Sequence, residues 1–331
     1  LHLSIRRQRQ MCIRDRMKIG TGLLILTAGA MLLLGGCGHG DASGRQHEAR
    51  LFGATYMTRN NPYFDVLNEG IEEVVEANGD ILLTRDPLQD QEKQNEQIQE
   101  MIDEGIQMLF LNPVDWEKVQ PALDACREAG VGIINVDTVV KDRDSVISII
   151  ETDNYQAGQL CALDMMKRKD EAKIVILDNP IQTSITNREQ GFLDTIAANH
   201  NYQVVYREAA AGEIEVSSHV MADLLRRDIS FDVILGGNDP TALGALAALQ
   251  QARREEGVLI YGIDGSPDFK AILDVGYVTG TSAQSPRSIG RKAAETAYRY
   301  LDGEPVEKYI SMPSTMITRD NLHEFEIDGW Q

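Results

Sequence analysis

The stretch FDVILGGNDPTALGALAALQQA, residues 231–252, contains the unit that repeats through this chain. A short apolar run ends in two glycines and the polar Asn238, and a helical pattern rich in alanine and leucine follows. Asp239-Pro240 places a capping side chain before a proline at the first helical position. The stretch therefore predicts a buried strand, a turn and a helix that runs through 242–252 and packs closely on a sheet.

The same unit recurs on both sides of this stretch. Continuous β-branched runs of this length suit parallel strands that are buried on both faces, and the helices between them give right-handed crossovers. Helix starts are marked by Asn61-Pro62 and Ser266-Pro267, and helix ends by Gly79 and Gly130. We therefore predict an α/β fold with two doubly wound parallel sheets. The predicted strands are 51–57, 81–85, 108–112, 131–137 and 146–150, then 173–178, 202–207, 231–238, 258–264 and 277–284.

Composition limits the class of protein. The 331 residues are 43% hydrophobic, which is enough for real cores, and carry a formal net charge of −19. The excess of acidic residues argues against nucleic acid as a partner, because phosphate binding requires basic patches. Cys126 and Cys161 lie on helical patterns of the body. Buried free thiols are the simpler interpretation, and a bridge between the two is the alternative.

The first 50 residues carry the pattern of a targeting segment. We expect residues 1–16, which have no core pattern, to be a non-native or misassigned leader. Residues 17–36 combine a lysine with an apolar run that is short for a membrane span, which is typical of a signal peptide. Small residues before Cys37 resemble a bacterial lipobox, which predicts a lipidated Cys37 and a polar tether over 37–50. A transmembrane anchor is the alternative. We expect an extracytoplasmic protein, lipid-anchored to the outer face of the cell membrane or periplasmic.

Polar side chains lie at or just beyond the ends of the predicted strands, which is where open α/β sheets bind ligands. Carboxylates accept hydrogen bonds and amides both donate and accept them, so the set favours a neutral, polyhydroxylated ligand. Each residue taken alone is equally an ordinary turn or cap residue. The set comprises Asn60 or Asn61, Asn112, Asp137, Asn238, Asp264 and Gln284.

Two aromatic residues, Tyr63 and Phe64, follow Asn61-Pro62 in the first turn of a predicted helix. Either ring could stack on the C–H groups of a sugar, and the alternative is packing of the helix on the sheet. Phe64 repeats with Leu67 at helical spacing, so we expect one of the two rings to belong to the core.

Several motifs carry a family resemblance through their order and spacing. They are Asn60-Asn61-Pro62-Tyr63-Phe64, Asn112-Pro113, Asn238-Asp239 before an Ala-Leu-Gly-Ala-Leu helix, Gly262-Ile263-Asp264-Gly265, and Gln284. From residue 51 to about 322 the chain resembles the ribose/galactose-type substrate-binding proteins of bacterial ABC sugar importers, which have the type I periplasmic-binding fold. The resemblance implies two lobes joined by three crossing segments. The N-terminal lobe would be 51–153 plus 285–312, and the C-terminal lobe 154–284 plus 313–331.

The resemblance also implies a set of ligand contacts. Arg188 precedes Gly191-Phe192 as the family's arginine does, and its guanidinium would clamp hydroxyls; a surface helix charge is the alternative. The implied contacts are Asn61, Tyr63, Phe64, Asn112, Asp137, Arg188, Asn238, Asp264 and Gln284. The chain departs from ribose binders at Thr138, Met57 and 209–212, where they carry an arginine, a serine and a stacking aromatic. Trp116 is a candidate replacement ring, although we expect a packing or rim role for it.

The sequence offers few signs of catalysis. It has no GxSxG elbow, P-loop or GxGxxG motif, and the histidines of the body lack the spacing of metal ligands. We expect a monomeric binding protein without a cofactor or metal, which captures a sugar or polyol by closure of its lobes and docks on an ABC transporter permease. A sensor of the same fold, signalling to a chemoreceptor or histidine kinase, is the alternative. A repressor core or a sugar-metabolising enzyme is further from the pattern.

Overall fold

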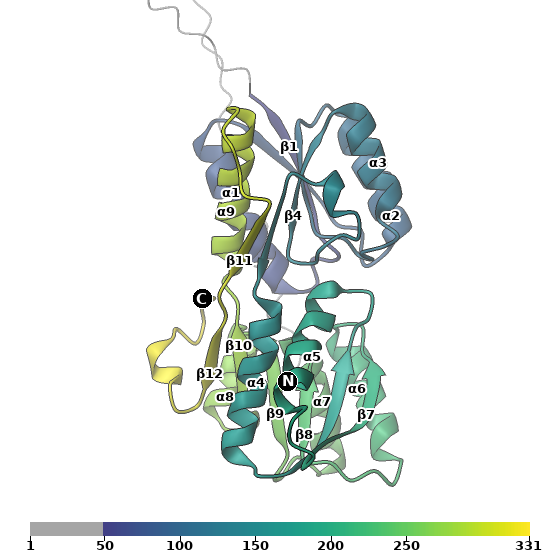
Figure 1. Ribbon diagram of the computed structural model, residues 1–331, viewed down its shortest axis with the longest axis vertical. Helices are drawn as coiled ribbons and strands as arrows, with labels where there is room; N and C mark the ends of the chain where they lie inside the picture. The colour runs from purple at the N-terminus through teal and green to yellow at the C-terminus, as the bar shows by residue number, and fades with distance from the viewer. Residues whose placement is uncertain (1–48) are drawn as a thin grey trace, which may run out of the picture. The chain divides into compact units, whose positions relative to one another are not determined.

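The computed structural model describes residues 49–331, which form two α/β lobes (Figure 1). The expected leader, signal peptide and lipidated Cys37, with nearly all of the tether, lie outside the described residues. Within residues 49–331, no helix combines the length and the apolar character needed to cross a membrane.

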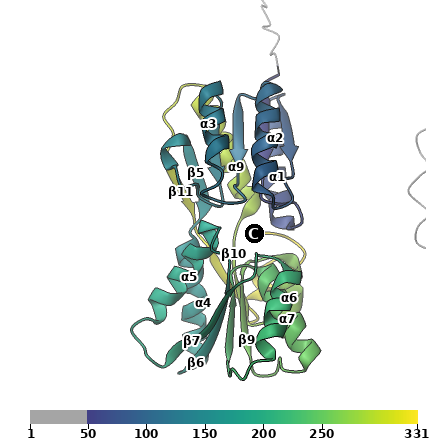
Figure 2. The same cartoon turned by 90° about the vertical axis from the view of Figure 1, so that its right-hand side faces the viewer.

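The first lobe is built on a sheet of strand order β11-β5-β4-β3-β1-β2, in which every pairing is parallel. Helices α1 and α9 cover one face, and α2 and α3 cover the other (Figure 2). The strands are β1 (Leu51–Thr55), β2 (Ile81–Arg85), β3 (Met108–Leu111), β4 (Gly132–Val136), β5 (Ser148–Thr152) and β11 (Tyr309–Met312). The helices are α1 (Pro62–Ala77), α2 (Gln91–Asp103), α3 (Gln120–Ala129) and α9 (Pro286–Leu301).

The second lobe repeats this plan with strand order β12-β10-β9-β8-β6-β7, and only β12 is antiparallel to its neighbour in this sheet. Helices α4 and α5 cover one face, and α6, α7 and α8 cover the other. The strands are β6 (Ala172–Asp178), β7 (Tyr202–Ala209), β8 (Val233–Gly236), β9 (Leu259–Asp264), β10 (Gly280–Ala283) and β12 (Thr315–Thr318). The helices are α4 (Asn154–Arg168), α5 (Thr183–Ile196), α6 (Ile214–Leu225), α7 (Asp239–Ala252) and α8 (Pro267–Asp274).

The central strands are apolar throughout because both of their faces are buried. In β6, Val175 and Leu177 pack toward α6–α8, whereas Ile174 and Ile176 pack toward α4 and α5. All ten predicted strand segments contain a strand. The sequence analysis missed β11 and β12, which are four residues long, lie at sheet edges and each begin with an exposed residue.

The chain passes between the two lobes three times within the described residues. It does so between β5 and α4, between β10 and α9, and between β11 and β12. The first and third passages are adjacent, because Asp153 N donates to Met312 O at 2.7 Å.

Capping side chains start the helices that point at the space between the lobes. Asn61 Oδ1 accepts from Tyr63 N at 3.0 Å, and Ser266 Oγ accepts from Phe269 N at 3.3 Å, as predicted. The prediction was wrong for Asp239: Asn238 caps α7, and the helix begins at Asp239 itself. Asp239 is instead fully buried and accepts from Ser266 N and Thr281 Oγ1, both at 2.7 Å.

The two cysteines of the body are free thiols, as the simpler interpretation predicted. Both are buried, Cys126 on α3 of the first lobe and Cys161 on α4 of the second. Burial raises the pKa of Cys126 to about 12. The alternative of a bridge between them is wrong.

Candidate functional site

The predicted ligand contacts come together where the carboxyl ends of the two sheets face each other. A space of about 30 Å³ between the lobes is lined by eight of the nine. They are Asn61, Tyr63, Phe64, Asp137, Arg188, Asn238, Asp264 and Gln284. This space is far smaller than the roughly 300–1,000 Å³ of small-molecule sites, because the lining side chains contact one another.

The ninth residue, Asn112, lies behind Asp137 and orients it. Asn112 Nδ2 donates to Asp137 Oδ2 at 2.9 Å, while its Oδ1 accepts from Met57 N at 3.0 Å. Asp137 has a φ of 62°, a left-handed conformation that aspartate tolerates better than most residues. Burial raises the pKa of Asp137, although the Arg188 guanidinium opposes that rise. Asn112 is therefore a supporting residue and not part of the lining.

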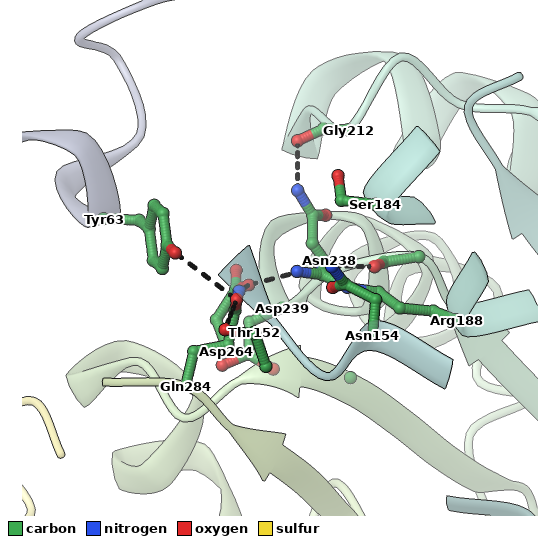
Figure 3. Close-up of polar contacts among 12 residues, drawn as sticks. Tyr63, Thr152, Asn154, Ser184, Arg188, Gly212, Asn238, Asp239, Asp264 and Gln284 are labelled. Atoms are coloured by element: carbon green, nitrogen blue, oxygen red, sulfur yellow. Dashed lines mark hydrogen bonds and ion pairs between the residues drawn. The ribbon is translucent and has the colours of Figure 1, made fainter. Parts of the chain in front are cut away.

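Arg188 is the central cation of the cluster. Its side chain is 4% exposed and leaves α5 to reach Asn154 Oδ1 at 2.8 Å and the Gly237 carbonyl at 2.9 Å (Figure 3). Nη1 also lies 3.6 Å from Asp264 Oδ1. The alternative of a surface helix charge is therefore wrong. An arginine held by several acceptors in this way presents its remaining donors in a fixed plane.

Gln284 connects the lobes at the centre of the cluster (Figure 3). Its Nε2 donates to Asp264 Oδ1 at 2.7 Å, and its Oε1 accepts from Thr152 Oγ1 at 2.6 Å. The Tyr63 hydroxyl, from α1 of the first lobe, donates to the same Oε1 at 3.3 Å. A single amide thus contacts groups from both sheets.

Asp264 keeps one acceptor free within this network. Its Oδ2 is buried and has no hydrogen-bond partner among the described residues. Burial raises the pKa of Asp264, and the Arg188 charge only partly offsets this effect. A buried carboxylate oxygen without a donor is costly, so a ligand hydroxyl that reached it would relieve that cost.

Tyr63 and Phe64 are both buried, so the expectation that one ring belongs to the core was too narrow. Tyr63 is 2% exposed and Phe64 is 3% exposed, and the two rings meet edge to face at 5.2 Å. Phe64 also stacks on Tyr56 at 5.7 Å. Both rings belong to the core of the first lobe, and both also line the small space.

A larger cavity of about 620 Å³ adjoins the cluster, which is within the range of small-molecule sites. It shares Met57, Asn61, Phe64, Gln182 and Asn238 with the small space. Asn238 stands on its wall, where its Nδ2 donates to the Gly212 carbonyl at 3.1 Å. The other lining residues are Thr58, Asn60, Pro62, Gln89, Ala211, Gly212, Glu213, Ile214, Glu215, Pro240, Leu243, Ser266, Pro267, Asp268 and Trp330.

Sequence reasoning missed several of these lining residues because it looked for polar groups at strand ends. Gln89 lies in the loop before α2 and donates to Glu213 of the second lobe. Gln182 precedes α5, and its Nε2 lies 2.9 Å from Met57 Sδ. Trp330 lies near the end of the described chain. The only sequence signal for a residue like Trp330 was the general preference of aromatic rings for the faces of sugars.

The three departures from the ribose-binder pattern have visible structural roles. Met57 lines both spaces, and Ala211 and Gly212 present a cavity wall without a ring. Thr138 Oγ1 donates to Asp137 Oδ2 at 3.1 Å and lies 3.0 Å from Ser184 Oγ of the second lobe. Trp116 lines neither space, and its ring lies under the Lys141 ammonium at 5.8 Å.

Direct hydrogen bonds hold the lobes together beside the cluster. Thr183 Oγ1 accepts from Val139 N at 2.9 Å and donates to Val139 O at 3.1 Å. Trp116 N donates to Ile181 O at 3.4 Å. Within the described part of the chain, no group of three or more His, Cys, Asp or Glu side chains is placed to hold a metal ion. The arrangement can bind hydroxyl groups by charged and amide hydrogen bonds from two opposed walls.

Known proteins are similar to this chain in sequence and in fold. Residues 52–305 match the family described as periplasmic binding protein domain. The chain is 31% identical to the ribose import binding protein of Escherichia coli over 252 residues, which cover 76% of this chain and 84% of that protein. It is 29% identical to the ribose import binding protein of Bacillus subtilis over 278 residues, which cover 84% and 90%. The crystal structure of the Caulobacter myo-inositol binding protein bound to myo-inositol superposes with a TM-score of 0.78 at 25% identity, covering 84% of this chain and 96% of that one.

Proposed function

Because the chain belongs to the periplasmic binding protein domain family, we propose that it is an extracytoplasmic solute-binding protein of an ABC importer. It captures a sugar or a sugar-like polyol between two closing lobes and delivers it to the transporter permease. The observation that carries this proposal is the buried cluster between the lobes. Tyr63 and Asp137 reach it from the first lobe, and Arg188 and Asp264 reach it from the second.

Capture works by a shift of populations between open and closed forms. Residues 51–153 with 285–312 form one lobe and 154–284 with 313–331 the other, and the three connecting passages act as the hinge. A ligand that touches both walls binds the closed form better than the open one, so it moves the equilibrium toward closure. The two-lobed closed surface is then the form that the permease recognises.

The lining favours a neutral ligand. The larger cavity is lined by Glu213, Glu215 and Asp268 and by no lysine or arginine among the described residues. The adjoining cluster sets Arg188 against Asp137 and Asp264. An anionic sugar would meet like charges at short range, which costs free energy in a buried site. We therefore expect neutral pentoses, hexoses, inositols and sugar alcohols to bind in preference to uronates or sugar phosphates.

The relatives suggest two kinds of ligand, a pentose and a cyclic polyol. The Escherichia coli and Bacillus subtilis relatives are ribose import binding proteins, and the Caulobacter structure holds myo-inositol. Met57, Thr138 and the ring-free wall at 209–212 differ from the ribose-binder pattern. A thermal-shift screen of neutral pentoses, hexoses, inositols and sugar alcohols tests the proposal, because a saturating ligand stabilises the folded state. No shift with any of them would contradict the sugar assignment.

We further propose that a signal peptide over 17–36 exports the chain and that Cys37 carries the lipid that anchors it. The support is the sequence pattern before Cys37. Metabolic labelling with a clickable palmitate analogue tests this, with Cys37→Ser as the variant and Cys12→Ser as the matched control. Equal labelling of the unsubstituted chain and the Cys37→Ser variant would contradict it. The anchored protein acts as a monomer. It releases the sugar unchanged, and mass spectrometry of the recovered ligand checks this.

A further inference from the structure

Segment 325–331, which follows β12 and a short 3-10 turn at Leu322–Glu324, is fixed to the second lobe. Phe325 and Ile327 pack against the core on the side of α6–α8. The Lys270 side chain, on α8 and fully buried, donates to the carbonyls of Glu326 and Gly329, both at 2.6 Å. Helix α8 therefore holds the backbone directly before Trp330.

Trp330 itself reaches the first lobe. Its ring meets the Tyr63 ring edge-on, with centroids 5.8 Å apart and an interplanar angle of 69°. It also packs against the core on the side of α1 and α9. Both ribbon views place the end of the chain at the level between the two sheets (Figures 1 and 2). A residue anchored on one lobe thus contacts the other beside the predicted ligand contacts.

The same ring forms part of the wall of the 620 Å³ cavity. The first turn of α8, with Ser266 and Pro267, lines this cavity too, so the helix that holds segment 325–331 also shapes the wall. Among the described lining residues, only Phe64 and Trp330 carry aromatic rings. Phe64 is buried against Tyr56, whereas Trp330 is partly exposed. Trp330 is therefore the ring with a face available to a ligand.

We propose that Trp330 is a ligand-contacting residue whose ring face stacks on the C–H face of a neutral sugar or cyclic polyol in this cavity. Lys270 is the positioning residue that holds it there. The inference rests on the proposed function and names the residue that supplies the aromatic surface. Apart from Trp330, the described residues of the second lobe that line this cavity, Ala211 and Gly212 among them, carry no aromatic ring. Aromatic rings suit the apolar faces of sugars, and Trp offers the largest area.

Calorimetric titration of the full chain in detergent tests the inference. The probe is the compound of the thermal-shift screen that binds the unsubstituted chain most tightly, with D-ribose, D-allose, L-arabinose and myo-inositol included in that screen. Trp330→Ala should weaken binding at least tenfold, and Trp330→Phe, which keeps a smaller ring, should weaken it less than Trp330→Ala does. Trp116→Ala is the matched control, since Trp116 lines neither space, and should stay within twofold. Melting temperatures establish that each variant is folded.

A spectroscopic readout separates ligand contact from a structural role. Trp116 and Trp330 are the two tryptophans of the chain, so Trp116→Phe leaves Trp330 as the sole emitter. The probe should then shift Trp330 emission to shorter wavelength and reduce its quenching by acrylamide at least twofold. Adding Lys270→Met should expose Trp330 before any sugar is added and weaken binding toward the level of Trp330→Ala.

The outcomes distinguish this inference from the function on which it rests. If no compound of the thermal-shift screen binds the unsubstituted chain, the proposed function fails and the inference fails with it. If the chain binds a probe but Trp330→Ala stays within twofold, the inference is overturned and the proposed function stands. The inference is likewise overturned if Trp330→Phe binds as weakly as Trp330→Ala, or if Trp330 emission does not respond to a bound probe.

Discussion

Arg188 Nη1 lies 3.6 Å from Asp264 Oδ1, and both side chains are only 4% exposed. The pair belongs entirely to the second lobe, with Arg188 on α5 and Asp264 at the end of β9. The second lobe therefore presents a cation and a carboxylate together at the strand ends. This pair offers a ligand hydroxyl group both a donor and an acceptor. Because both side chains are buried, a substitution at either residue should change the stability of the lobe as well as ligand binding.

Arg188→Met should lower the free energy of unfolding by about 3 kcal/mol, because it removes the cation beside the buried Asp264 carboxyl group and the donors to Asn154 and Gly237. The double variant Arg188→Met with Asp264→Asn should recover part of that loss, since the amide carries no charge, whereas the bonds to Asn154 and Gly237 stay absent. Urea denaturation measures both. Arg226→Met is the control, because Arg226 pairs with Asp223 on the surface and exposed pairs contribute little. A double variant no more stable than the single one would contradict the pairing.

Asn238→Ala should lower ligand affinity by about 1–3 kcal/mol, because a ligand group left without its partner is buried in the closed form. Asn238 also caps α7, so its loss costs stability as well. Asp90→Ala is matched to it: Asp90 caps α2 through Glu92 N and Lys93 N and lines neither space. Both variants should lose about 1 kcal/mol of stability by denaturation. Calorimetry should show weaker binding only for Asn238→Ala, and equal affinities would remove Asn238 from the site.

The sequence predicted the parts of the site that follow from strand ends. Asn112, Asp137, Asn238 and Gln284 each lie within two residues of the end of a strand, and parallel strands bring such positions to one edge of a sheet. Arg188 came from a family resemblance, since nothing in its own helix pattern distinguishes it from a surface charge. Local pattern and motif spacing together therefore predicted which residues form the cluster.

Other parts depend on contacts that no local pattern encodes. Asn238 and Asp239 are both good caps before Pro240, and only the hydrogen bonds of Asp239 to Ser266 and Thr281 decide which one starts the helix. Trp330 enters the cavity because Lys270, 60 positions earlier in the sequence, holds the backbone next to it. Such long-range pairings are set by the packed fold, so sequence analysis could not predict them.

The contribution of Glu151 to the stability of the folded protein should fall as the pH rises toward 8. Burial raises the pKa of Glu151 to about 7, although Tyr309 and Asn154 donate hydrogen bonds to its carboxylate. The folded protein therefore binds this proton more tightly than the unfolded chain. The stabilisation is complete below the ordinary carboxyl range and is lost as the pH rises through about 7.

Glu151→Gln removes the titratable carboxyl group and with it this pH-dependent contribution to stability. The difference in unfolding free energy between the variant and the unsubstituted chain should change by about 3 kcal/mol between pH 4 and pH 8, in favour of the variant at high pH. Urea denaturation across that range measures it. Glu256→Gln, at an exposed position, should follow the unsubstituted chain at every pH. A Glu151→Gln profile parallel to that control would contradict the buried titration.

Gly158→Ala should damage both stability and binding, because α4 and α5 touch through their backbones at this point. A Cβ on Gly158 would lie 1.7 Å from the carbonyl oxygen of Arg188. The helix that carries Arg188 would have to move, which we expect to cost about 3 kcal/mol. Leu163→Ala on the exposed face of α4 is the control and should change stability by less than about 0.5 kcal/mol. Denaturation and calorimetry of both variants check this, and a Gly158→Ala variant with unchanged affinity would show that Arg188 tolerates the shift.

Thr183→Val should favour the open form, because one hydroxyl satisfies both backbone groups of Val139 across the lobes. In the closed form the variant leaves that N–H and C=O without partners, whereas water satisfies them in the open form. A loss of about 1 kcal/mol for the closed state corresponds to roughly fivefold weaker sugar binding. The radius of gyration without sugar, measured by small-angle X-ray scattering, should rise and should fall again at saturating sugar. Thr195→Val on the same helix removes a hydroxyl that bonds only to Gly191 O within α5, so it should leave both measurements unchanged. If Thr183→Val leaves affinity and radius as they are, these hydrogen bonds do not control closure.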